Sequence, residues 1–201
     1  MSFLDILAIL VTGTLYTSAP IIFTALGGVF SERSGVVNIG LEGLMLFGAF
    51  IGVVTNLLMG DTWGTMTPWI ALLFAAIGSG LFALLHAVAS ITFRADQVVS
   101  GVAINFLSLG LTVFAIKKIF DKGQTDFIQY RIEKIDIPGL SDIPVLGKIF
   151  FSNVPITSYI AIILAFVVWY VIYKTPFGLR LRAVGEHPMA ADTMGINVYK
   201  M

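Results

Sequence analysis

Charged residues are missing from four long stretches of this chain, and their absence limits how the chain can fold. The four stretches lie between Asp5 and Glu32, between Asp61 and Arg94, between Asp96 and Lys117, and between Lys148 and Lys174. Residues 34–60 contain one charge, Glu42. Each run is long enough for the ~20 residues with which a helix crosses the hydrocarbon core of a bilayer. These runs are apolar all round, unlike surface helices of soluble proteins. The sequence therefore predicts an all-α, polytopic helical membrane protein.

Composition excludes several other classes of function. Charged residues make up 12% of the chain, against roughly 25% in soluble domains. The net charge is zero, which gives no electrostatic basis for binding nucleic acid. The chain has no cysteine, which excludes disulfides, iron–sulfur clusters and thiolate metal sites. We expect no catalytic residue, metal or cofactor.

Five transmembrane spans are expected, forming the N-terminal part of one transmembrane domain over residues 1–201. We place them at about 4–30, 36–59, 68–92, 98–116 and 156–173. The first span has no basic leader and no small-residue cleavage site, so we interpret it as retained. Three connections are short, so neighbouring spans should pack antiparallel. Five spans put the two ends on opposite sides, and the chain stops in a polar segment, so we expect a fragment of a longer product.

The basic residues give the expected orientation. Six Lys and Arg residues lie in the connections 31–35 and 93–97 and in the tail, and six lie in the loop 117–155. The first six are in shorter segments near the spans, where the positive-inside bias is strongest. This favours an outside N-terminus, an external loop 117–155 and a cytoplasmic tail 174–201.

Asn38 and Glu42 are the most unusual polar residues near the second span. If the segment is helical, their spacing places both on one face. An acidic residue inside a span costs roughly 2.5–3.5 kcal/mol on insertion scales and normally faces a bundle interior or water. The pair could form a polar wall of a substrate path, or it could be a buried staple that fixes the second span against a neighbour.

Three further polar residues lie within the third and fourth spans. Asn105 and Ser108 are three residues apart and share a helical face, so they could line a path or form interhelical hydrogen bonds. His86 is interpreted as a packed or hydrogen-bonded core residue in preference to a proton relay.

The polar tail carries the signals of a short helix. Pro188 suits the first helical position and Gly195 the position just past the last one. Two turns from Pro188 to Met194 would present Ala190 and Ala191 beside Glu186 and Asp192. A helix this short is marginal alone and needs a partner surface, which small alanines would allow to approach closely. The alternative is a solvated surface turn.

Three segments together resemble one known family. They are GVFSERSGVVNIGLEGLM at residues 28–45, RADQVVSG at 94–101, and GLRLRAVGEHPMAADTMGIN at 178–197. They are similar to the nucleoside-type permeases of ATP-binding-cassette (ABC) importers, which belong with the ribose and branched-chain amino acid permeases. The resemblance covers essentially the whole chain.

The resemblance implies a multi-pass subunit of the bacterial plasma membrane that performs no covalent chemistry. Its partners would be ABC ATPase subunits, a second permease subunit and an extracellular substrate-binding lipoprotein. The cytoplasmic segment would be the coupling segment that ATPase closure acts on, and more spans would follow it. The family's coupling positions carry over to Gly185, Glu186, Pro188, Ala190, Ala191, Asp192 and Gly195.

Three other classes remain open at this point. A branched-chain amino acid or simple-sugar permease shares the expected architecture and differs only in its solute. A membrane-embedded enzyme or electron-transfer subunit is disfavoured, because the chain has two histidines and no cysteine. A secondary transporter would work without a partner ATPase.

Overall fold

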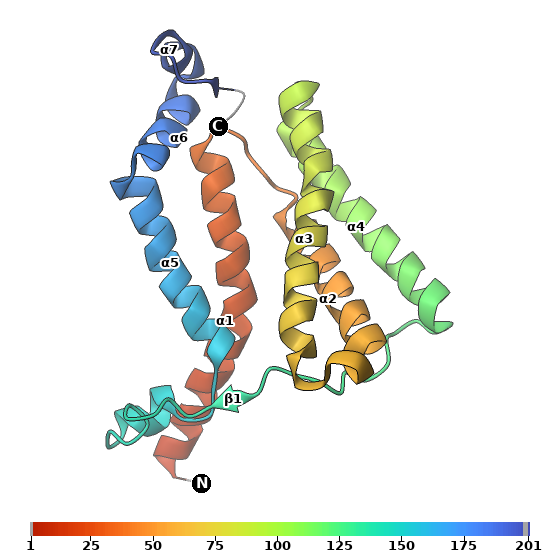
Figure 1. Ribbon diagram of the computed structural model, residues 1–201, viewed down its shortest axis with the longest axis vertical. Coiled ribbons are helices and arrows are strands. Elements are labelled where there is room, and N and C mark those ends of the chain that lie inside the picture. The colour runs from red at the N-terminus through yellow and green to blue at the C-terminus, as the bar shows by residue number, and fades with distance from the viewer. Residues whose placement is uncertain (1, 199–200) are drawn as a thin grey trace. The chain divides into compact units, whose positions relative to one another are not determined.

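The computed structural model describes residues 2–198 and 201; the predicted tail segment 174–201 therefore includes two residues, 199 and 200, outside the described part. The elements are mostly helices (Figure 1). They are α1 (Phe3–Arg33), α2 (Leu41–Trp63), the 3₁₀ turn η1 (Gly64–Met66), α3 (Thr67–Ala87), the π-helical turn η2 (Val88–Thr92), α4 (Gln97–Phe120), β1 (Lys134–Ile135), the π-helical turn η3 (Gly147–Phe151), β2 (Val154–Pro155), α5 (Ile156–Lys174), α6 (Pro176–Glu186) and α7 (Pro188–Thr193).

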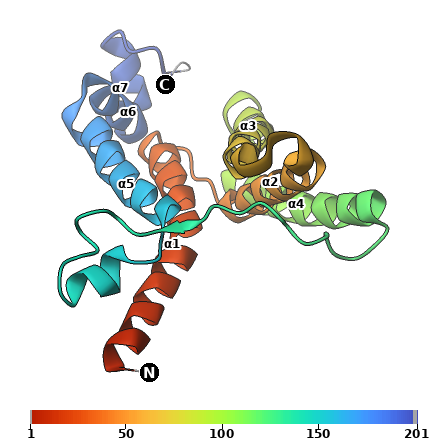
Figure 2. The ribbon, with the colours of Figure 1, turned by 60° about the horizontal axis from the view of Figure 1, so that its bottom comes forward.

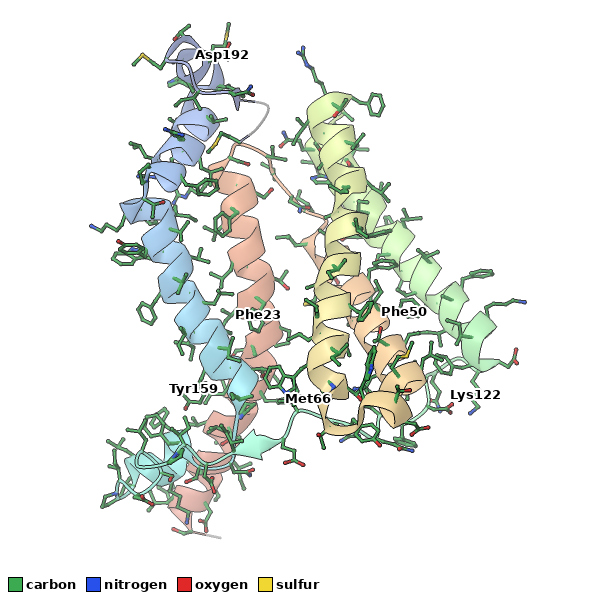
Figure 3. The ribbon with its side chains drawn as sticks, in the orientation of Figure 1. Phe23, Phe50, Met66, Lys122, Tyr159 and Asp192 are labelled. Carbon is green, nitrogen blue, oxygen red and sulfur yellow. The ribbon has the colours of Figure 1, made fainter. Side chains whose placement is uncertain are left out.

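Four stretches of the described chain are long and apolar enough to cross a membrane. They are Phe3–Arg33, Leu41–Thr92, Gln97–Phe120 and Ile156–Lys174. The second stretch has 52 residues and contains both α2 and α3, joined at the turn where Met66 lies (Figure 3). The described chain thus provides five long helices for the five predicted spans, which confirms the all-α polytopic class.

Three helix ends lie four or five residues from the predicted span bounds: both ends of α2, which runs from Leu41 to Trp63, and the end of α4. The second span, predicted from residue 36, begins as a helix only at Leu41, because the preceding residues form turns held by other helices. The fourth span runs to Phe120, four positions into the predicted loop 117–155. Lys117 and Lys118 lie in its last turn, where positive charge is favourable beside the free carbonyl groups.

The chain forms two compact units. The first contains residues up to Gly27 together with Ile132–Leu179, and the second contains Gly28–Arg131 together with Arg180–Met201.

In the first unit, α5 lies beside α1 (Figures 1 and 2). The Ser158 hydroxyl donates a hydrogen bond to the Leu15 carbonyl at 2.6 Å. The loop before α5 is more ordered than expected, because Ile135 pairs with Val154 in a short antiparallel ladder. The hydroxyl of Tyr159, which is labelled in Figure 3, donates a hydrogen bond to the Phe150 carbonyl in that loop.

In the second unit, α2 packs against both α3 and α4. Leu44, Phe82 and Ile104, one from each helix, form the core of this contact. Phe47 stacks on Phe82 with ring centroids 4.1 Å apart. Since a stacked aromatic pair adds about 0.5–1.5 kcal/mol beyond its burial, this contact helps to fix α2 on α3. The three helices form the frame for the polar residues described next.

Candidate functional site

The segment 34–40, here called the connector, joins α1 to α2 without forming a helix. Its glycine at position 35 has a φ of +86°, a conformation that glycine adopts without steric cost. Backbone N–H and C=O groups outside a helix need hydrogen-bond partners from protein or water. Several of these partners are side chains of α3 and α4.

The first anchor of the connector is Val37. Its N–H donates to the Gln97 side-chain oxygen at 2.7 Å, and its carbonyl lies 3.3 Å from His86 Nε2. A carbonyl can only accept, so Nε2 carries the proton and Nδ1 accepts from the Ser100 hydroxyl at 3.0 Å. His86 is buried, which agrees with its interpretation as a hydrogen-bonded core residue.

The second anchor is made by Asn105 and Ser108 of α4. The Asn105 Oδ1 accepts from the Gly43 N–H at 2.7 Å, and its Nδ2 donates to the Ile39 carbonyl at 3.2 Å. The Ser108 hydroxyl donates to the Gly43 carbonyl at 2.6 Å. Both residues make interhelical hydrogen bonds, one of the two roles considered from the sequence.

Asn38 and Glu42 do not share a helical face, because the helix on which that expectation depended begins only at Leu41. Asn38 precedes the helix, and its Oδ1 accepts the Gly40 N–H at 3.0 Å. Glu42 lies in the first turn of α2, near the positive end of the helix dipole. Its side chain is exposed and has no hydrogen-bond or ion-pair partner in the described chain. The site therefore presents one free carboxylate beside a backbone held on both sides.

The tail contains the predicted short helix and one that was missed. α7 begins at Pro188 as expected, and Gly195 just beyond it has a φ of +81°. The missed helix is α6, which ends at Glu186. The Thr175 hydroxyl caps it by accepting the Gly178 N–H at 3.2 Å. Thr followed by Pro was a local N-terminal signal that could have revealed this helix.

The two alanines of α7 have different surroundings. Ala191 is 4% exposed, whereas Ala190 is exposed to solvent. Met189 and Met194 are more than four-fifths exposed, and Asp192 also lies on this helix (Figure 3). The surface open to a partner is therefore formed by Ala190 and the methionines, while Ala191 packs inside the chain.

Gln97 and Ser79 are two anchors that the sequence did not assign. Gln97 lies in the motif at residues 94–101 and Ser79 in the predicted third span, and the sequence indicated no contact for either. The Ser79 hydroxyl donates to the Leu44 carbonyl at 2.9 Å, and it adds a further bond between α2 and α3. Neither contact has a local signature, because each partner lies at least 35 residues away.

Comparison with curated proteins gives relatives along nearly the whole chain. It is 63% identical over 201 residues to the guanosine ABC transporter permease protein NupQ of Bacillus subtilis. It is 50% identical over 199 residues, 99% of this chain, to the nucleoside ABC transporter permease protein NupC of Lactococcus lactis. It is 36% identical over 191 residues, 95% of this chain and 56% of the relative, to the putative glucose ABC transporter permease protein TsgC13 of Haloferax volcanii.

The chain spans 63% of the length of NupQ and 62% of that of NupC. No solved structure matches it. Residues 10–201 match the protein family described as the permease component of the branched-chain amino acid transport system. This match confirms the resemblance carried by the three motifs. The chain belongs to that family of transport permeases.

Proposed function

We propose that the full-length protein is a permease subunit of an ATP-driven importer for nucleosides in the bacterial plasma membrane. The observation that carries the solute class is the 63% identity to a relative named as a guanosine permease. The relative at 50% identity is named as a nucleoside permease. A simple-sugar importer is the second candidate, because a relative at 36% identity is named as a putative glucose permease.

Within this proposal Glu42 contributes to the substrate path. Its carboxylate is free and exposed in the described chain, and an intramembrane carboxylate normally faces a water-filled cavity or a partner. A carboxylate accepts hydrogen bonds from hydroxyl and N–H groups, both of which nucleosides offer. The polar groups of Asn38, Asn105 and Ser108 form hydrogen bonds with the backbone around Glu42. We therefore assign these residues a positioning role in that path.

The proposed coupling to ATP rests on the tail. α7 is six residues long, too short to be stable without tertiary contacts, and it exposes Met189 and Met194. Methionine surfaces are common at protein interfaces. We assign ATPase docking to residues Glu186, Pro188, Ala190, Asp192 and Gly195, and supporting roles to the buried Ala191 and to Gly185, which packs against the chain's own backbone. The further partners are a second permease subunit and a substrate-binding lipoprotein outside the cell.

The orientation proposed from the charges places the tail in the cytoplasm and the loop before α5 outside. That arrangement puts α7 where ATPases can reach it. It also leaves the exposed loop residues, such as Phe127, on the side of the lipoprotein.

The test is uptake of labelled guanosine, uridine, glucose, ribose and leucine by cells with and without the full-length subunit. We expect nucleoside uptake to depend on the subunit, and unlabelled nucleosides to compete while glucose, ribose and leucine do not. An ATPase partner unable to hydrolyse ATP is the matched control and should abolish uptake. Subunit-dependent uptake of only a sugar or an amino acid would contradict the solute class. Uptake that persists with the inactive ATPase would contradict the importer class.

A further inference from the structure

The tail and the connector meet at a backbone contact between glycines. A Cβ atom added to Gly185 would lie 2.4 Å from the Arg33 carbonyl oxygen and 3.1 Å from the Gly35 nitrogen. A Cβ added to Gly35 would lie 3.2 Å from the Gly185 Cα. All three residues belong to the second unit. The main chains can lie this close only because neither glycine has a side chain.

On the connector side, this contact leads to a tightly held turn. The Ser31 hydroxyl donates to the Val36 carbonyl at 2.6 Å, and the Val36 N–H donates to the Ser31 carbonyl at 3.1 Å. The next residue is Val37, which Gln97 and His86 hold. A displacement at Gly35 therefore acts on a backbone that is hydrogen-bonded on both sides. Six residues after Gly35, α2 begins at Leu41, with Glu42 in its first turn.

On the tail side, the contact lies at the end of a continuous helix. Gly185 is the last but one residue of α6, and the His187 N–H still bonds to the Ala183 carbonyl. His187 then leaves helical geometry, with φ −146° and ψ 84°, and α7 follows at once. One residue separates α6 from α7, so a force applied to α7 reaches Gly185 over a very short length of chain.

We propose that the Gly185–Gly35 contact is the joint through which docking on α7 moves the connector. Gly185 and Gly35 are positioning residues in this scheme, because they act through the connector and touch neither ATP nor solute. The inference rests on the proposed ATP-driven import and adds the route by which ATPase closure reaches Glu42. Small shifts at packed contacts can switch larger elements because such contacts are bistable and do not deform gradually.

Gly185→Ala tests the joint with a single methyl group. Relief of the 2.4 Å approach to an ordinary contact of 3.4 Å requires a separation of 1.0 Å between the tail and Arg33. Gly110→Ala is the matched control, because it places the same methyl on a glycine of α4 with nothing within 4 Å. The full-length variants are purified with their partners and reconstituted into vesicles with ATP. Assembly, basal ATP hydrolysis and nucleoside transported per ATP are then measured.

For Gly185→Ala we expect normal assembly and basal hydrolysis, with transport per ATP reduced at least about fivefold, the lower end of typical coupling between sites. Gly110→Ala should match the wild type. An unchanged transport ratio in Gly185→Ala overturns the joint, while normal wild-type uptake leaves the proposed function standing. A wild type that transports no nucleoside contradicts the proposed function instead.

Hydrogen exchange of the wild-type complex decides the outcome if Gly185→Ala does not assemble. We compare the nucleotide-free complex with one trapped by ATP and vanadate. The proposal requires a change in exchange of the amides of residues 35–40 together with a change in α7. Protection of α7 with no change in residues 35–40 would show that the glycines only pack, and would overturn the joint.

Discussion

Replacing Asn105 with leucine removes the one side chain of α4 that holds both the connector and the start of α2. Two backbone groups then lose their partner: the Gly43 N–H at 2.7 Å and the Ile39 carbonyl at 3.2 Å. Gly43 lies in the first turn of α2, where N–H groups have no partner within the helix.

The expected loss in the free energy of unfolding can be bounded from two sides. A buried polar group left unsatisfied costs about 1–3 kcal/mol, and this applies to the Gly43 N–H, because Gly43 is buried whereas the bond to the Ile39 carbonyl is exposed. Hydrogen bonds measured inside membrane proteins average ~0.6 kcal/mol, which gives a lower bound of about 1.2 kcal/mol for the two bonds. Ser108→Ala should cost less, about 0.5–1.5 kcal/mol, because the Gly43 carbonyl keeps its bond within the α2 ladder.

The assay is the thermal unfolding midpoint of the full-length subunit in detergent, followed by size-exclusion chromatography. Leu109→Ala, on the exposed face of the same helix, is the control and should leave the midpoint unchanged. The expected order of midpoints is wild type, then Ser108→Ala, then Asn105→Leu. A midpoint for Asn105→Leu at or above that of Ser108→Ala refutes the reasoning. Normal stability with lost uptake would show that Asn105 lines the path.

Four further outcomes are expected. Glu42→Gln should preserve assembly but reduce nucleoside uptake or change its selectivity, and normal uptake at normal abundance would remove Glu42 from the path. Ala190→Arg should insert normally yet lose its ATPase in a pull-down, because an unpaired charge buried in an interface costs several kcal/mol. Ala191→Arg should also disturb α7 itself, seen as faster proteolysis of the tail. Asp126→Cys should react with an impermeant thiol reagent on intact cells and Glu186→Cys only on opened cells; the reverse would invert the proposed orientation.

The spans could be predicted from sequence because the signal is local. A run of about twenty apolar residues is stable as a helix in lipid whatever its neighbours are. The limits of α7 also follow from local residues, Pro188 and Gly195. Thr175 followed by Pro is likewise a local signal, and it marks the start of α6. Orientation depends on the membrane and on partners, and it remains a prediction.

The site depended on contacts between distant parts of the chain. Nothing local shows that the helix starts at Leu41 and not at residue 36, because the connector is stable only where Gln97 and Asn105, 60 or more residues later, satisfy its backbone. For the same reason the spacing of Asn38 and Glu42 suggested a shared face that does not exist. Sequence thus determined which segments enter the membrane, because burial in lipid acts on each segment separately. Tertiary structure decided which polar groups form hydrogen bonds within the chain and which, like Glu42, stay free. The hydrogen-bond partners of a residue depend on which helices pack against each other.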